Sequence, residues 1–231
     1  MRWAILSVPC AGVALLPSGL AAVSAALLSV LAAGDHALVT DSAYLPTRQF
    51  CDRLLARYGI RVTYYDPLVG GRIAALFEPN TRAVFVESPG SLSFEMQDVP
   101  AIAAAAHAQG AAVLMDNTWA SPLYVRALDK GVDLSIQSGT KYIGGHSDLM
   151  LGTVSANAHW WRRLRETVET MGLCVGPDDM YLGLRGLRTM GARLAQHQTA
   201  GLKIGRWASL DRKSTRLNSS HSGESRMPSS A

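Results

Sequence analysis

The chain has 231 residues, of which 48% are hydrophobic and 17% are charged, so it can bury the core of one sizeable α/β domain. Its formal net charge of +4 comes from basic residues scattered along the chain, which argues against a nucleic-acid partner. The three cysteines, Cys10, Cys51 and Cys174, form neither a CxxC motif nor a Cys/His cluster of zinc spacing. The composition therefore predicts a cytoplasmic protein with no metal site.

The stretch from Trp3 to Ala33 contains no charged residue and allows two interpretations. A signal peptide or membrane helix is one of them, because a long apolar run is typical of both. Pro17, Ser18 and Gly19 interrupt the run, however, and leave two shorter pieces. We favour a buried strand over residues 12–17 and a buried helix over residues 18–33, and the membrane interpretation stays open.

Short apolar segments then alternate with helical patterns along the chain. Strands are predicted at residues 36–41, 61–66, 83–88, 112–117, 132–138 and 149–157. Helices are predicted at residues 46–59, 70–77, 99–110, 121–131 and 159–172, with a succession of further helices from Pro177 onward. This alternation predicts an α/β fold with a mainly parallel sheet and helices on both faces.

Ligands in such sheets bind beyond the carboxyl ends of the strands, which singles out the residues that directly follow a predicted strand. These are Tyr44, Ser88, Asp116 and the stretch Ser138–Lys141. The ring of Tyr44 could stack on a flat cofactor, or it could be an ordinary core side chain.

Asp116 and Lys141 carry the clearest chemical signal. An acid at the end of an apolar strand is desolvated and needs a cation nearby. Lys141 follows 25 residues later and is flanked by the hydroxyls of Ser138 and Thr140. An acid, a lysine and small hydroxyls at successive strand ends match what pyridoxal phosphate (PLP) requires: a ring-nitrogen partner, a Schiff-base lysine and a phosphate cup. The alternative is that Asp116 caps the next helix and Lys141 is a surface residue.

The stretch from Pro17 to Ala22 is a second candidate for phosphate binding. Ser18 and Gly19 open a predicted helix, and the exposed amides at a helix start attract anions. Ser18 could equally be an ordinary N-cap. His146 has no second metal ligand at helical or hairpin spacing, so we expect it to make a structural hydrogen bond.

Several motifs together resemble a known family. "DVPAIAAAA", "DNTWASP", "SIQSGTKYIGGHSDLMLGTVSAN" and "LGLRGLRTMGARLAQH" are similar to the Cys/Met-metabolism PLP-dependent enzymes, over about Ala11 to Leu210. The resemblance implies the large domain of the PLP-dependent transferases, an aspartate aminotransferase-like fold. Within the family, "FVESPGSLSFEMQDVP" resembles the bacterial cystathionine β-lyases, whereas the γ-synthases and γ-lyases usually have Asn-Pro at Gly90-Ser91.

The resemblance also implies roles for individual residues. Lys141 would be the Schiff-base lysine and proton shuttle, and Tyr44 would stack on the ring and help to activate the substrate. Asp116 would pair with the ring nitrogen, with Thr118 beside it. The phosphate would be bound by the amides of Gly19 and Leu20 and by Ser138 and Thr140. Arg185 and Arg188 are interpreted as bracing residues.

The implied reaction is the β-elimination of L-cystathionine to homocysteine, pyruvate and ammonia, a step of trans-sulfuration and methionine biosynthesis. A γ-lyase, a γ-synthase, or an inactive fragment that acts only as a binding module are the alternatives. We expect a PLP-binding domain over residues 1–187, the start of an interdomain helix over 188–210 and a disordered, non-native tail over 211–231. An N-terminal segment and a C-terminal domain of the family are not found in the sequence, so we expect little activity from this chain alone. The full-length protein is expected to be a homotetramer.

Overall fold

The computed structural model describes residues 10–210, and it contains one seven-stranded sheet with the order β1-β7-β6-β5-β4-β2-β3. Strand β7 runs antiparallel to β1 and β6, and the other neighbours pair in parallel. The strands are β1 (Gly12–Leu16), β2 (His36–Thr40), β3 (Arg61–Tyr65), β4 (Thr81–Glu87), β5 (Ala112–Asp116), β6 (Leu134–Ser138) and β7 (Gly152–Ala156). The predicted mainly parallel sheet is confirmed.

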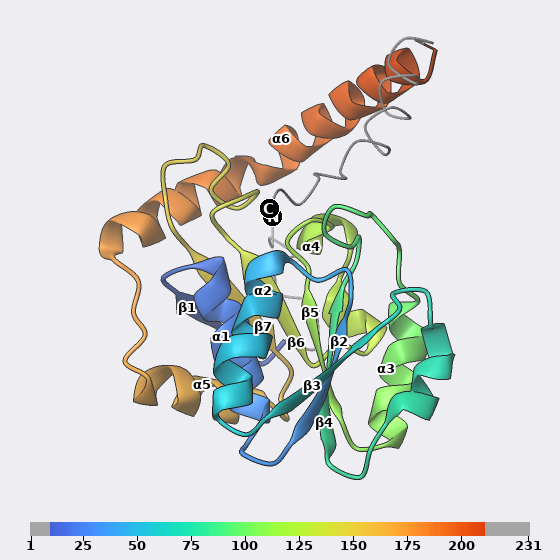
Figure 1. Ribbon diagram of the computed structural model, residues 1–231. Coiled ribbons are helices and arrows are strands. Elements are labelled where there is room, and N and C mark those ends of the chain that lie inside the picture. The colour runs from blue at the N-terminus through green and yellow to red at the C-terminus, as the bar shows by residue number, and fades with distance from the viewer. Residues whose placement is uncertain (1–9, 211–231) are drawn as a thin grey trace, which may run out of the picture. The chain divides into compact units, whose positions relative to one another are not determined.

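Helices cover both faces of this sheet, as Figure 1 shows, with α1, α2 and α5 on one side and α3 on the other. The α-helices are α1 (Gly19–Val30), α2 (Leu45–Phe50), α3 (Val99–Ala108), α4 (Ser121–Tyr124), α5 (Trp161–Thr170) and α6 (Pro177–Leu210). Shorter turns of 3-10 helix lie at Gly70–Leu76 and Ala127–Lys130, and α2 continues as a π-helix over Cys51–Leu55.

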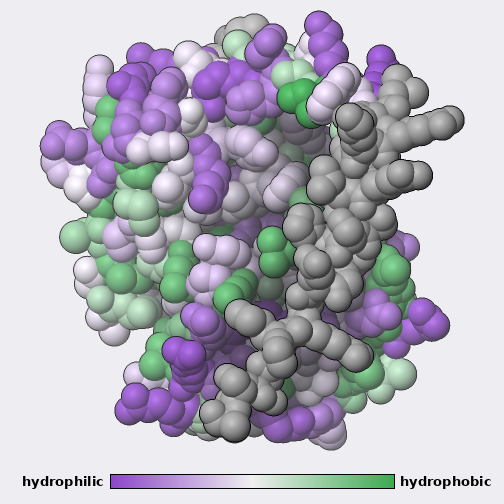
Figure 2. Space-filling view, turned by 45° about the horizontal axis from the view of Figure 1, so that its top comes forward, coloured by the Kyte–Doolittle hydropathy of each residue, from purple (hydrophilic) through white to green (hydrophobic). Residues whose placement is uncertain are grey.

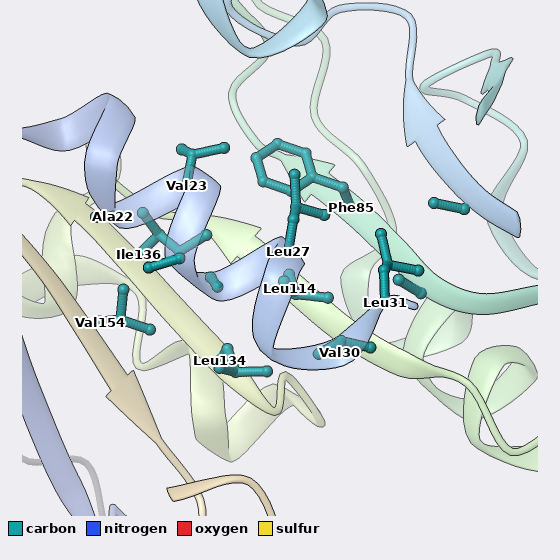
Figure 3. Close-up of a cluster of buried hydrophobic side chains, with 14 of the residues drawn as sticks. Ala22, Val23, Leu27, Val30, Leu31, Phe85, Leu114, Leu134, Ile136 and Val154 are labelled. Atoms are coloured by element: carbon teal, nitrogen blue, oxygen red, sulfur yellow. The ribbon is translucent and has the colours of Figure 1, made fainter. Parts of the chain in front are cut away.

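Helix α1 is apolar nearly all round because it is buried against the sheet. Its side chains Ala22, Leu27 and Val30 pack on Phe85, Leu114, Leu134, Ile136 and Val154 of four neighbouring strands (Figure 3). The alternate residues of β4 and β5, such as Val84 and Val113, face the opposite layer with Ile102 of α3. Each fully buried Leu, Ile or Phe contributes about 2 kcal/mol of transfer free energy. The two-sided burial explains why these strands are continuous apolar runs.

The structure corrects two predicted helices. The helix expected at 121–131 is broken, because Val125 is extended and Arg126 is also non-helical between α4 and the 3-10 turn. The buried Asn117 holds this break, since its Nδ2 donates to the Val125 carbonyl at 2.8 Å. In contrast, the succession of helices expected after Pro177 is the single helix α6 of 34 residues. Its internal glycines lower helix propensity by about 1 kcal/mol each without ending it.

The chain divides into two compact units, the first reaching Arg188 and the second beginning at Thr189. The sheet and every predicted site residue belong to the first unit. The tail predicted to be disordered from Asp211 lies outside the described residues. Across residues 10–210, no helix combines the length and the apolar character that a membrane crossing requires.

Candidate cofactor site at the strand ends

The candidate site lies where β2, β4, β5 and β6 end, since parallel strands bring their carboxyl ends to one edge of the sheet. In Figure 1 the helices that follow β2 and β5, α2 and α4, lie at the top of the sheet and mark this edge. Figure 2 turns that side toward the viewer and shows hydrophobic and hydrophilic residues intermingled on it. The predicted residues Tyr44, Asp116 and Ser138–Lys141 lie on or shortly after these strand ends, whereas Gly19 and Leu20 lie at the start of α1, after β1.

Strand parity places three polar side chains on the same face of the sheet. Glu87, Asp116 and Ser138 are the last residues of β4, β5 and β6, and each has the parity of the residues that pack on α1. Glu87 and Asp116 are register partners in the parallel pair β4–β5. All three therefore project to the face of the sheet that α1 covers.

Asp116 is held in place by hydrogen bonds and forms no ion pair with any described residue. Its Oδ1 accepts the backbone N–H of Thr118 at 2.9 Å, and none of the ion pairs within residues 10–210 includes it. Burial raises the pKa of Asp116, and the hydrogen bonds from Thr118 oppose the rise. The alternative that Asp116 caps the next helix is wrong, because the N-cap of α4 is Ala120. Asp116 is thus a desolvated acid that forms no ion pair with a cation among residues 10–210.

Thr118 connects this acid to the next strand end. Its Oγ1 accepts the backbone N–H of Ser138 at 2.7 Å. The structure therefore joins Asp116, Thr118 and Ser138 in one hydrogen-bond network.

The start of α1 closes on Ser138. A Cβ built on Gly19 would lie 2.6 Å from Ser138 Oγ, so only glycine allows the helix start to approach this closely. Ser18 is the N-cap, as the alternative interpretation held, and its Oγ accepts the N–H of Ala21 at 3.1 Å. The N–H groups of Gly19 and Leu20, in the first turn, have no partner inside the helix. The first turn of α1 and the hydroxyl group of Ser138 together form a polar cradle that is suited to binding an anion.

Lys141 lies in a tight loop that begins at the same strand end. Its backbone N–H donates to the Ser138 carbonyl at 3.0 Å, and its own carbonyl accepts from Gly145 at 2.7 Å. The Lys141 side chain is exposed, and it takes part in none of the ion pairs formed by the described residues. The loop fixes the backbone of this lysine and leaves its amine accessible.

Neighbouring residues hold this loop. The Thr140 hydroxyl, predicted to bind phosphate, donates to the Leu151 carbonyl at 3.3 Å and accepts the Leu151 N–H at 3.1 Å. His146 makes the structural hydrogen bond that was expected, with its Nδ1 at 2.9 Å from the Gly144 carbonyl. The Arg185 guanidinium pairs with Asp148 at 2.5 Å, which agrees with a bracing role. Thr140 as a phosphate ligand stays a prediction.

Tyr44 precedes α2 and exposes 52% of its surface, so the alternative of a buried core tyrosine is wrong. Its backbone N–H donates to Glu87 Oε2 at 2.8 Å, which fixes the backbone of the residue that carries the ring. The ring is accessible to a planar ligand at this edge.

Glu87 is the functional candidate that the sequence analysis missed. It is 8% exposed, and its Oε1 accepts the Ser91 hydroxyl at 2.6 Å. Burial, together with the negative charge of Asp116, raises the pKa of Glu87 to about 7. The signal was present, because "AVFVES" places an acid at the end of an apolar strand just as "AVLMDN" does. Phe94 and Trp119 were also missed; both are more than half exposed, and their rings meet edge to face at 5.1 Å.

Comparison with known proteins identifies the family. The model of the Cys/Met metabolism PLP-dependent enzymes matches residues 7–220. This chain belongs to that family. A Rhizobium johnstonii protein that is provisionally named a cystathionine beta-lyase is 58% identical over 197 residues, which are 85% of this chain and 50% of that protein. The Escherichia coli cystathionine beta-lyase MetC is 45% identical over 210 residues, 90% of this chain and 53% of that enzyme.

A solved structure agrees with this assignment. The crystal structure of metB from Corynebacterium glutamicum superposes with a TM-score of 0.85 at 29% identity, covering 88% of this chain and 53% of that one. The chain thus spans about half the length of the curated relatives it matches. The fold expected from the resemblance, that of the PLP-dependent enzymes, is confirmed.

The described residues fit PLP on two observations of this structure. Asp116 is a desolvated acid that forms no ion pair with any described residue, and a protonated pyridine nitrogen would supply the missing positive charge. The contact of Gly19 with Ser138 forms a cradle that any larger residue at position 19 would fill, and a phosphate group would be bound there by amides and a hydroxyl. Both lie on the face of the sheet toward which Glu87 also projects.

Proposed function

We propose that this chain carries the PLP-binding half of a carbon–sulfur lyase that removes the β-substituent of L-cystathionine. The observation that carries the proposal is the connected set Asp116–Thr118–Ser138 against the start of α1, with the Lys141 loop beginning at Ser138. Relatives that are named cystathionine beta-lyases and share 45% identity over most of this chain support the choice of reaction. The substrate would be a small amino-acid thioether.

Each residue of the site would have a separate role in the reaction. When bound, PLP supplies an electron sink that stabilises negative charge on the substrate Cα. Lys141 would hold the cofactor covalently in the resting state, and its Nζ would take the proton from the substrate Cα. Asp116 would keep a proton on the ring nitrogen by supplying the negative charge beside it. The first-turn amides of α1 and the Ser138 hydroxyl would bind the phosphate, and Tyr44 would cover one face of the ring.

Covalent labelling tests the cofactor assignment. The chain is incubated with PLP, reduced with borohydride and digested, and the labelled peptide is mapped by mass spectrometry. We expect the label on Lys141 and its loss in Lys141→Ala, while Lys130→Ala, which changes a lysine outside the site, keeps it. Label at another lysine, or undiminished label in Lys141→Ala, would contradict the assignment.

Product analysis tests the reaction. Cystathionine treated with the PLP-loaded full-length protein should yield pyruvate, whereas γ-elimination would yield 2-oxobutyrate. A further relative, the Wolbachia pipientis L-alanine/L-glutamate racemase, is 37% identical over 191 residues, so exchange of the Cα hydrogen with solvent and loss of optical activity should be followed in the same samples. Racemisation of alanine or glutamate without pyruvate formation would replace the lyase proposal.

We also propose that the full-length protein acts in the cytoplasm as a homo-oligomer, a tetramer. Exposed apolar residues next to the site support this, since Leu92 is 91% exposed and Phe94, Met96 and Trp119 are each more than half exposed. Such a cluster is typical of a surface that another subunit covers. Light scattering of the protein after size exclusion should give a mass that is a multiple of the chain mass, and a monodisperse monomer would contradict the proposal.

A further inference from the structure

Glu87 lies at the centre of the contacts that join two of the strand ends. Its Oε2 accepts the backbone N–H of Tyr44 at 2.8 Å, and its Oε1 accepts the Ser91 hydroxyl at 2.6 Å. The Ser91 N–H in turn donates to the Ser42 carbonyl at 2.8 Å. One buried carboxylate thus connects the segment after β2, which carries the Tyr44 ring, to the loop after β4.

The two segments that Glu87 connects are packed tightly against each other. A Cβ built on Gly90 would lie 2.5 Å from Ser42 Oγ, so the loop after β4 packs directly on the segment after β2. On its other side, the Glu87 backbone carbonyl accepts from Gln97 Nε2 at 2.8 Å, and Gln97 is itself buried. Both the side chain and the backbone of Glu87 are therefore held in place.

The neighbours of Glu87 include a second acid and two neutral hydrogen-bond donors. Its partner in the register of β4 and β5 is Asp116, and paired residues of adjacent strands lie about 4.8 Å apart and project to the same face. From the segment after β2 it receives the Tyr44 N–H, and from its own following loop the Ser91 hydroxyl. Within residues 10–210, no arginine, lysine or histidine forms an ion pair with it. Two buried acids side by side without a cation form a site for a positively charged group.

We propose that Glu87 is a positioning residue of the cofactor site, which fixes Tyr44 beside the ring and adds its negative charge to that of Asp116 in attracting a cationic ring nitrogen. The inference rests on the proposed PLP site and extends it to a second acid. It differs from a purely structural role, because a structural role needs only the two hydrogen bonds and not the charge.

The charge leads to a specific dependence on pH. Without a ligand, burial and the negative charge of Asp116 raise the pKa of Glu87 and favour its protonated form. A cation at the ring nitrogen favours the ionised form, so Glu87 must release its proton when the cofactor binds near neutral pH. Binding linked to the release of one proton tightens by up to tenfold per pH unit below the pKa of the free site. This component of PLP affinity is absent if Glu87 carries no charge.

Three variants of the 231-residue chain separate charge from structure. Glu87→Gln keeps both hydrogen bonds, since the amide oxygen can accept from Tyr44 and the amide nitrogen can donate to Ser91, but it removes the charge. Ser91→Ala removes the hydroxyl that lowers the pKa of Glu87, so it leaves the charge and raises the pH at which that charge appears. Glu95→Gln is the matched control, because it removes one negative charge from the same loop.

The dissociation constant of PLP is measured from pH 5.5 to 8.5 for the four proteins, by absorbance of bound PLP and by quenching of tryptophan fluorescence. We expect the wild-type protein and Glu95→Gln to bind more tightly as the pH rises through neutrality. In Glu87→Gln the dissociation constant of PLP should lack this pH dependence, which amounts to as much as tenfold per pH unit. In Ser91→Ala the dissociation constant should change in the same way as in the wild-type protein, but at higher pH.

The outcomes distinguish the two proposals. If the wild-type protein binds PLP and Glu87→Gln follows its pH curve, the inference about Glu87 is overturned while the cofactor site stands. If Glu87→Gln fails to fold, an unshifted curve in Ser91→Ala overturns the inference by itself. If the wild-type protein does not bind PLP at any pH, the proposed function fails and this inference fails with it.

Discussion

Gly186 offers a sharp test of how the lysine loop is held. In helix α6 a glycine-to-alanine change normally raises stability by about 1 kcal/mol, because alanine has the higher helix propensity. At Gly186, however, a Cβ would lie 2.2 Å from the Ile143 carbonyl oxygen and 2.3 Å from that of Gly144. Both oxygens belong to the backbone of the loop that carries Lys141. The helix therefore lies directly against this loop.

The magnitude follows from the contact distances. Non-bonded atoms are at their optimum about 3.5 Å apart, so the loop or the helix must move by roughly 1 Å to admit the methyl group. Two backbone carbonyls cannot rotate out of the way as a flexible side chain could. Overpacking of this kind lowers the free energy of unfolding by about 1–3 kcal/mol, which outweighs the gain in helix propensity.

The assay compares Gly186→Ala with Gly191→Ala in the same helix, by urea unfolding followed with circular dichroism. Apart from the neighbouring backbone of α6 itself, no described residue lies within 4 Å of a Cβ built on Gly191, so that variant should gain up to about 1 kcal/mol. We expect Gly186→Ala to be less stable than Gly191→Ala by about 1–3 kcal/mol, because the gain in helix propensity is common to both, and to label poorly with PLP at Lys141. Equal stability of the two variants would refute the reasoning.

Two further predictions concern buried acids. Burial and Asp116 raise the pKa of Glu87 from 4.5 to about 7, so in the cofactor-free chain the free energy of unfolding should fall as the pH rises between these values. Glu87→Gln should remove up to about 3 kcal/mol of this fall, as urea unfolding at pH 5 and pH 8 would show, and an unchanged pH dependence would contradict the assigned shift. Asp133→Ala should lower the free energy of unfolding by about 2–4 kcal/mol, because Asp133 accepts the buried Val113 N–H at 2.8 Å. Asp129→Ala, which removes only a partly exposed ion pair with Arg126, should change it by less than about 1 kcal/mol, and a similar loss in both variants would argue against the role of Asp133.

Sequence motifs identify most of the candidate site residues, but they do not identify all of them. Asp116 was found because an acid that ends an apolar strand is conspicuous. Glu87 satisfies the same rule but was passed over in favour of Ser88, since its significance depends on being the register partner of Asp116, 29 positions along the chain. A linear pattern shows that a strand ends in an acid, but it does not show which strand lies beside it.

The alternation of elements follows from the sequence alone, because the apolar period reports which side of a segment is buried and glycines such as Gly59 and Gly131 mark where helices end. The family motifs around Lys141 likewise indicated the cofactor without coordinates. Only the tertiary structure decided that β7 runs antiparallel, that the helix after Ser121 breaks at Val125 and that the Thr140 hydroxyl bonds to the backbone of Leu151. Each of these depends on a contact that forms only when the chain folds back on itself, and the sequence pattern of one helix or strand does not contain the energy of such a contact.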